Sequence, residues 1–307
     1  MVELQYADYY IELSHREEWD SWNLHEENFR EWLLPIQLQS AREQLKALGS
    51  PTEVQRDNLL EILTWLYRWG YSTADVLSDL LGRANRSHAR RLAKSGWVIP
   101  VTILSYPTYY VLSAKGLAEI THHSEYLLEY IEIDPYRVHL PTLHHYLIAQ
   151  SETIAAMSFD YDGYLTERTY PCAFNEDTIP WKLADVIFMK RCETAFHKNA
   201  YELTGVEIEL TPKWGHKLDQ FVTNIIDDIQ TGRLHNFLVI SDSKAILKRY
   251  KEAFAPGKKV ARWQKTKVGK FTATGEVLEI PSWASKHIFF REVGSMDPYP
   301  TLDWALS

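Results

Sequence analysis

Three acidic residues in the second half of the chain have a spacing that could bring them to one metal ion. Asp185 starts an apolar run at residues 184–190, and Glu207 and Glu209 alternate within a second run at residues 201–211. Alternate residues of a strand share a face, so both glutamates lie on one side if the second run is a strand. If the two runs pair, Asp185 comes alongside. Three carboxylates this close raise one another's pKa unless a cation lies between them.

The chemistry that such a set could perform is phosphodiester hydrolysis. Oxygen ligands alone suit Mg²⁺ or Mn²⁺ rather than zinc. Lys213 and Lys217 follow the second run, where an ammonium group would orient a water or stabilise charge that develops on phosphate. The alternative is that Glu207 and Glu209 only line the solvated face of an edge strand. The order of the surrounding elements favours the nuclease-type site.

These residues need a sheet with helices around it to hold them. The apolar spacing predicts a helix at residues 141–158, strands at 164–170, 184–190 and 201–211, a helix at 214–229, a strand at 236–241 and a helix at 244–254. The order α-β-β-β-α-β-α is typical of a mixed sheet flanked by helices. We therefore predict an α+β domain at residues 137–255.

A second set of chemically distinctive residues is basic and lies in the first half of the chain. Helical spacing at residues 54–69, 73–81 and 86–95 is followed by two β-rich runs at 97–104 and 108–112. This is the layout of a winged helix-turn-helix, whose third helix enters the major groove of DNA. The third helix and the turn before it carry five cations and no acid: Arg83, Arg86, Arg90, Arg91 and Lys94. We predict a DNA-binding domain at residues 51–122, and the alternative is a helix-turn-helix that contacts protein.

The flanking parts of the chain differ sharply in charge. Residues 1–50 are acidic, rich in Trp and helix-periodic, which predicts a helical N-terminal segment. Residues 256–307 form a basic and then β-rich extension, and residues 244–270 carry ten Lys or Arg against Glu252 alone. We expect the cations of the extension to contact phosphates while Trp263 and Phe271 stack on bases, or else to form a solvated linker. These cations are Lys258, Lys259, Arg262, Lys265 and Lys267.

Composition narrows the class of protein further. The chain has 307 residues, of which 45% are hydrophobic and 24% charged, and a net charge of −8. These values fit a folded protein and argue against one that coats DNA nonspecifically. Cys172 and Cys192 are the two cysteines, which excludes a disulfide scaffold and fits a cytoplasmic location. We expect no signal peptide, no membrane insertion and, without a phosphate-binding glycine loop, no ATP-driven motor.

The order of elements, with Asp185 followed by Glu207-x-Glu209, resembles the PD-(D/E)XK nuclease superfamily. The stretch GVEIELTPKWGHKL at residues 205–218 is similar to the replication-relaxation family of plasmid and mobile-element proteins, which includes the MobC-type relaxases. Members of this family pair an N-terminal winged helix with that nuclease core. The likeness covers residues 54–254 and implies a winged helix followed by a restriction-endonuclease-like domain.

The resemblance also implies roles for single residues. Asp185 matches the aspartate of the motif and Glu207 matches the acid of its E-x-K element. Glu209 stands where most members have lysine, so Lys213 or Lys217 would take the place of that lysine. The resemblance also implies that Gln220, on the following helix, faces the same site. It further implies Mg²⁺ or Mn²⁺ as cofactor and single-strand cleavage at a plasmid transfer or replication origin.

We therefore expect a metal-dependent DNA nickase that acts on plasmid or mobile-element DNA, as a homodimer or with accessory mobilization or replication proteins. Two alternatives stay open: a non-catalytic, sequence-specific DNA-binding regulator with a degenerate nuclease fold, and a dimeric double-strand endonuclease. A covalent intermediate on Tyr6, Tyr9 or Tyr10 has no support from spacing. Adjacent histidines on a helix point about 100° apart, so we do not expect His144 and His145 to share a metal ion.

Overall fold

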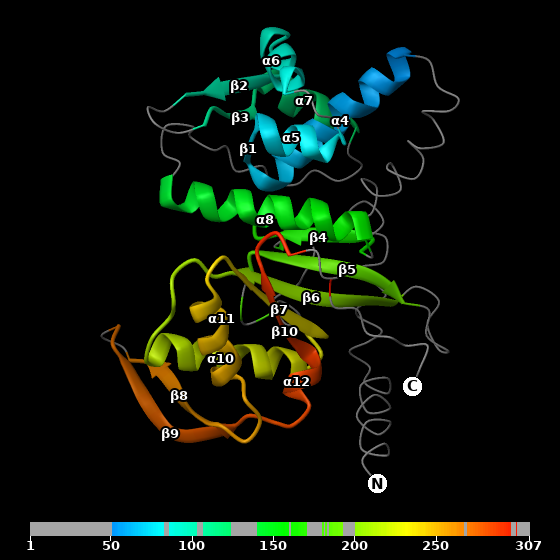
Figure 1. Ribbon diagram of the computed structural model, residues 1–307. Coiled ribbons are helices and arrows are strands. Elements are labelled where there is room, and N and C mark those ends of the chain that lie inside the picture. Colours follow the sequence, from blue (N-terminus) through cyan, green and yellow to red (C-terminus); the bar gives the residue numbers. More distant parts are fainter. Residues whose placement is uncertain are drawn as a thin grey trace.

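The computed structural model describes residues 51–82, 86–102, 107–123, 140–159, 161–170, 180, 182, 184–192, 200–266, 269–295 and 299 (Figure 1). These residues form helices and mixed sheets, and the α+β class is confirmed. The predicted helical segment at residues 1–50 and the cations Arg83 and Lys267 lie outside the described residues.

The first unit contains helices α4 (Pro51–Trp69), α5 (Ala74–Leu80), α6 (Ser87–Lys94) and α7 (Ala114–His123). Strands β1 (Tyr71–Thr73), β2 (Val98–Val101) and β3 (Tyr109–Leu112) form an antiparallel sheet in the order β1-β3-β2. The predicted helices and hairpin are present. β1 was not predicted, because a strand of three residues is too short to show a period.

Local chemistry explains where these helices begin and end. Gly70, with a φ of 84°, ends α4 in a conformation that favours glycine. The Thr73 hydroxyl accepts a hydrogen bond from the backbone N–H of Val76 at 3.4 Å and so caps α5. At Gly116 of α7, a Cβ would lie 2.3 Å from the carbonyl oxygen of Trp97. The absence of a side chain there lets α7 pack closely against the chain that leads into β2.

The second unit follows the predicted order of elements. It consists of α8 (Leu140–Phe159), β4 (Gly163–Thr166), β5 (Val186–Cys192), β6 (Ala200–Ile208), α10 (His216–Gln230), β7 (Asn236–Ser241) and α11 (Lys244–Ala253). β4, β5 and β6 run antiparallel, whereas β6 and β7 are parallel and are connected through α10. β6 ends at Ile208, three residues before the predicted end of this strand.

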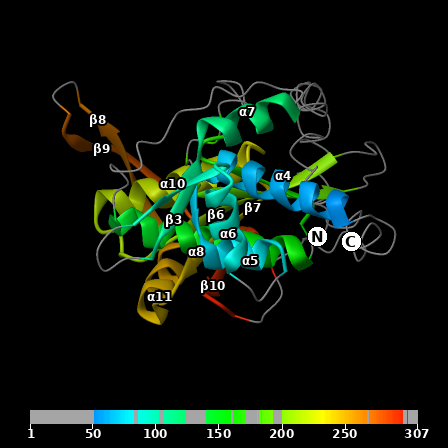
Figure 2. The same cartoon turned by 90° about the horizontal axis from the view of Figure 1, so that it is seen from above.

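The sheet continues past the predicted end of the second domain at residue 255. β10 (Ile288–Glu292) pairs in parallel with β7, which gives the order β10-β7-β6-β5-β4. Before it come β8 (Lys259–Lys265), β9 (Phe271–Glu279) and the short helix α12 (Ala284–His287). β8 and β9 form an antiparallel hairpin that projects from the rest of the molecule (Figure 2). The basic stretch is therefore a hairpin rather than a linker.

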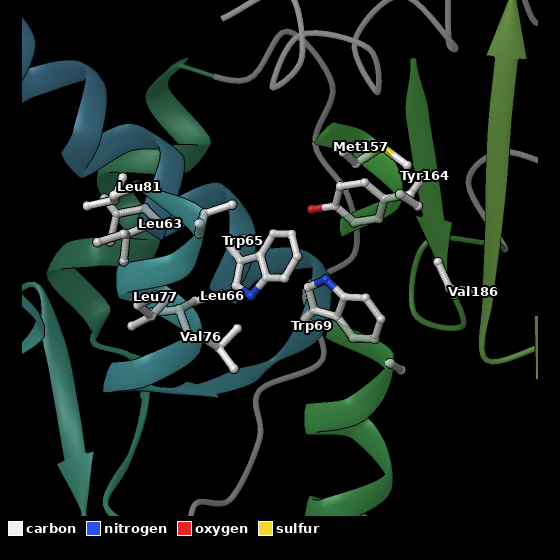
Figure 3. Close-up of a cluster of buried hydrophobic side chains, with 14 of the residues drawn as sticks. Leu63, Trp65, Leu66, Trp69, Val76, Leu77, Leu81, Met157, Tyr164 and Val186 are labelled. Carbon is white, nitrogen blue, oxygen red and sulfur yellow. The ribbon is translucent and has the colours of Figure 1, made fainter. Parts of the chain in front are cut away.

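Both faces of the five-stranded sheet are covered by apolar side chains. Alternate residues of β5 and β6 pack with α10 and α11 on one face, and with α8 and the first unit on the other. On this second face Trp65 and Trp69 of α4 lie beside Tyr164 of β4 (Figure 3). Gln150 of α8 accepts a hydrogen bond from the Trp65 indole at 2.9 Å and donates one to the carbonyl oxygen of Tyr71 at 2.9 Å. Helix α8 therefore joins the first unit to the sheet.

Candidate functional site

The three acidic residues singled out by the sequence lie together at one end of β5 and β6. Val186 pairs with Val206, and the N–H of Asp185 donates to the carbonyl oxygen of Val206 at 2.9 Å. The next pair in this register sets Asp185 opposite Glu207, and directly opposed residues of antiparallel strands share a face. The sheet register thus brings Asp185 alongside Glu207, as the sequence predicted.

Glu209 continues the same face just beyond the end of β6. Its N–H donates to the carbonyl oxygen of Ile240 at 2.8 Å, and its carbonyl oxygen accepts from the Ser241 hydroxyl at 2.6 Å. Parallel pairing with β7 therefore extends one residue past the strand. The neighbouring apolar residues Val206, Ile208 and Leu210 pack on the other face, with α8. The alternation predicted for this stretch is confirmed.

Two lysines neutralise the buried glutamates. Lys213 Nζ lies 3.1 Å from Glu207 Oε1 and also pairs with Glu209 Oε1, while Lys182 Nζ lies 2.6 Å from Glu207 Oε2. The ring of Phe221, on α10, lies 4.6 Å from the Lys213 ammonium. Lys182 was missed by the sequence analysis. Its signal is weak, since it is only one lysine three residues before Asp185.

A histidine from α8 completes the cluster on the Asp185 side. His145 Nε2 lies 3.1 Å from Asp185 Oδ2 and 2.9 Å from the carbonyl oxygen of Ile208. The same carboxylate oxygen of Asp185 accepts a hydrogen bond from the Ile208 N–H at 2.7 Å. His144 is exposed and points elsewhere. His145 was not predicted at this site, because its contact with Asp185 depends on how α8 packs across the sheet.

The charges of these groups depend strongly on one another. Burial and the charge of Asp185 raise the pKa of Glu207, and they outweigh the effect of Lys182 and Lys213. Burial lowers the pKa of Lys213, although the contact with Glu207 opposes this shift. For His145, burial acts to lower the pKa, but the hydrogen bond and charge of Asp185 prevail and the pKa is raised. Burial therefore favours the neutral form of the carboxyl groups in this cluster, and their ionised form is held against that preference.

The donor set can be compared with what a divalent metal requires. Across the described ranges, no group of three or more His, Cys, Asp or Glu side chains is arranged to hold a metal ion. Mg²⁺, however, uses one or two carboxylates together with waters and substrate phosphates. The adjacent carboxylates of Asp185 and Glu207 supply the oxygen donors of that smaller set. Lysines engage both oxygens of Glu207 and one of Glu209, so a metal ion would have to share Glu207 with Lys182 and Lys213.

Two further residues proposed for the site lie outside these contacts. Lys217 is exposed in the first turn of α10. The sequence left open whether Lys213 or Lys217 would reach the acids, and Lys213 is the one that contacts them. Gln220 is half-buried on α10, and among the described residues its side chain makes no hydrogen bond with the carboxylates. Of the two lysines, Lys213 is therefore the one at the site.

The predicted DNA-contacting cations divide into exposed and engaged groups. On α6, Ala89 and Leu92 are buried and the exposed cations are Arg90, Arg91 and Lys94. Arg86 is at the N-cap of α6 and pairs with Asp75. On and before β8 the exposed cations are Lys258, Lys259 and Lys265. Arg262 instead binds both carboxylate oxygens of Asp227, at 2.6 and 2.7 Å, so its guanidinium forms an ion pair within the protein.

Comparisons with protein-family models, curated proteins and solved structures found no match to this chain. Among the helices that the structure describes, none is both long and apolar enough to cross a membrane.

Proposed function

We propose that this chain is a Mg²⁺- or Mn²⁺-dependent DNA endonuclease that nicks one strand of plasmid or mobile-element DNA. The observation that carries the proposal is the buried cluster at the end of β5 and β6. There the register of β5 and β6 sets Asp185 opposite Glu207 on the neighbouring strand, and Lys213 bridges Glu207 and Glu209. A set of acids with an interposed lysine is suited to phosphodiester hydrolysis.

The order α8, β4, β5, β6, α10 and β7 supports a restriction-endonuclease-like core for this unit. We propose that Asp185 and Glu207 hold the metal ion, which would supply a Lewis acid that polarises the phosphate and lowers the pKa of water. Lys213, whose pKa is lowered by burial, would orient the attacking water and stabilise negative charge on the phosphate. Lys182 would keep the Glu207 carboxylate in place, and His145 would do so for Asp185.

The first unit supports a site-selecting role. We propose that α4, α5, α6 and the β2–β3 hairpin form a winged helix-turn-helix in which α6 enters the major groove. Arg90, Arg91 and Lys94 are exposed on α6, and the buried side of that helix packs in the core. Cations on one exposed helix face are what phosphate and base-edge contacts require.

The test is nicking of a supercoiled plasmid that carries the DNA flanking the gene of this protein. We expect conversion to the open-circular form with Mg²⁺ or Mn²⁺, and a loss of about 100-fold or more in rate for Asp185→Asn. Glu252→Gln, on the exposed side of α11, is the matched control and should nick at the wild-type rate. Nicking by Asp185→Asn at the wild-type rate would overturn the assignment.

Two other outcomes would select the remaining alternatives. Linear product would identify a double-strand endonuclease acting as a dimer. Tight, salt-sensitive binding without cleavage would identify a DNA-binding regulator of replication or transcription, and Glu207→Gln would then leave the affinity unchanged.

A further inference from the structure

A surface of aromatic rings and cations begins beside the carboxylate cluster and extends onto the β8–β9 hairpin. We call it the aromatic surface and define it by Trp214, His216, Arg249, Trp263 and Phe271. Trp214 is 63% exposed and Phe271 is 38% exposed. Large rings directed at solvent contribute little to a core. Exposed rings that lie beside cations or other rings indicate a binding role.

One end of the aromatic surface touches the candidate site. Trp214 directly follows Lys213 in the chain. The guanidinium of Arg249, on α11, lies 3.3 Å from the centre of the Trp214 ring, and its Nε donates to the carbonyl oxygen of Lys213 at 3.2 Å. The same arginine thus holds the exposed ring and the backbone of the lysine that bridges Glu207 and Glu209.

The other end of the aromatic surface lies on the hairpin. The ring of His216 stacks on that of Phe271, with centroids 4.9 Å apart and planes inclined by 24°, and it lies 5.7 Å from the ring of Trp263. The Trp263 indole N–H donates to Asp219 of α10 at 2.9 Å. Together with the Arg262–Asp227 pair, this bond fastens β8 to α10, whereas β9 is almost wholly exposed. The hairpin is therefore fixed to α10 at the middle of β8.

The charge around these rings identifies the kind of partner. Exposed cations lie on or beside the same elements, α10, α11 and the hairpin: Lys217, Lys248, Lys258, Lys259, Lys265 and Lys270. Cations that neutralise phosphates, combined with rings that stack on bases, are the recognition chemistry of single-stranded nucleic acid. Bases inside a duplex stack on each other and do not present their faces to such rings. An apolar protein interface would be depleted of lysine.

We propose that the aromatic surface binds an unpaired stretch of DNA and leads it to Asp185 and Glu207. This inference rests on the proposed function, because the bound strand is the one that the proposed nuclease site would cut. It assigns different DNA forms to the two units: α6 contacts the duplex, and the aromatic surface holds the separated strand that is to be cut.

Binding alone tests this inference, without cleavage. The probe is a fluorescently labelled oligothymidine of about 20 residues, which forms no duplex, in EDTA so that no divalent metal is present. Trp214→Ala and Phe271→Ala should each weaken its binding roughly 10-fold, as expected for the loss of one stacked base. Val277→Ala is the matched control, since Val277 is an aliphatic side chain of β9 that is 59% exposed, and it should bind like the wild type.

A duplex of the same length separates the two surfaces. The double variant Arg90→Ala/Lys94→Ala should weaken duplex binding and spare oligothymidine binding, whereas Trp214→Ala should do the reverse. Oligothymidine binding that is unchanged in both ring variants would overturn the inference, as would an equal loss for both DNA forms. If the ring variants behave as expected but no DNA is nicked, the aromatic surface stands and the proposed function fails.

Discussion

Two buried clusters of charged side chains contact α8, and they differ in how the charge of their carboxylates is balanced. Glu152, on α8, accepts hydrogen bonds from Arg291 at 3.3 Å, from the N–H of Gly294 at 2.9 Å and from the Tyr299 hydroxyl at 2.6 Å. The Arg291 guanidinium also lies 4.1 Å from the centre of the Tyr299 ring. A single carboxylate is thus enclosed by donors and one permanent cation.

The Glu207 cluster has the opposite character. It gathers three carboxylates, and their cations are two lysines and a histidine, whose protons can be removed. The pKa of Glu207 is raised and that of Lys213 is lowered, both chiefly because of burial. His145, whose Nε2 contacts this cluster, lies seven residues before Glu152 on the same helix, about 10 Å away along its axis. The Glu152 cluster thus joins β10 and Gly294 to α8, whereas the Glu207 cluster consists of groups whose charges depend on the binding of protons.

The largest effect on stability should follow from removing the cation that neutralises the buried carboxylate of Glu152. Arg291→Met keeps much of the side-chain volume but leaves a buried carboxylate without its cation. We expect the free energy of unfolding to fall by about 3–5 kcal/mol, measured by urea denaturation at neutral pH.

The control for this change is Arg262→Met, which breaks a more exposed ion pair, since the side chain of Arg262 is 32% exposed. It should cost no more than about 1 kcal/mol. The double variant Glu152→Gln/Arg291→Met should regain much of the loss, because no buried charge remains. An Arg291→Met protein as stable as the wild type would remove the distinction between the two clusters.

Removing the charge of Glu207 should have the opposite effect on the free energy of unfolding. Because its pKa is raised in the folded protein, the ionised form of Glu207 disfavours folding at neutral pH. Glu207→Gln keeps the shape and removes that charge. We expect an unchanged or higher denaturation midpoint, with a gain on the order of 1 kcal/mol, together with loss of any nicking. A loss of stability as large as that of Arg291→Met would show that Glu207 is a structural residue.

The same contrast marks what the sequence can predict. The alternation of Glu207 and Glu209 against Val206 and Ile208 has a period of two, so their faces follow from the strand itself. The run NFLVIS became β7 with its predicted ends, Asn236 and Ser241, because a short apolar run beside turn residues marks a buried strand. Features that depend on a pattern repeating within one helix or strand can therefore be predicted from the sequence.

Contacts between distant elements leave no such pattern. The partners His145 and Ile208 are 63 residues apart, and Arg291 and Glu152 are 139 residues apart. Arg262 reads as one cation in a basic run, yet it pairs with Asp227 on α10. Similarly, β10 joins the sheet only through the parallel register with β7. Each of these depends on tertiary packing, which spacing along the chain does not encode.

A third effect, smaller than that of Arg291→Met and limited to acid pH, extends the contrast to a histidine beside β6. His235 Nδ1 accepts a hydrogen bond from the N–H of Leu203 at 3.0 Å, so this nitrogen carries no proton. Burial, aided by the nearby His287, lowers the pKa of His235 to about 4. Between that value and about 6.5, the unfolded chain binds a proton that the folded protein does not. Stability should therefore be fully present above about pH 6.5 and fall as the pH is lowered toward 4.

His235→Asn isolates this effect, because the Asn side-chain oxygen can take the acceptor role of Nδ1 without titrating. Urea denaturation of both proteins from pH 4 to pH 8 should show the wild type losing about 2 kcal/mol more than the variant at the acid end, a modest value because His235 is only half-buried. The carboxylates common to both proteins cancel in this difference. Parallel pH profiles would mean that the pKa of His235 is the same in the folded and the unfolded protein. They would contradict a His235 whose Nδ1 is held unprotonated as the acceptor of the Leu203 N–H.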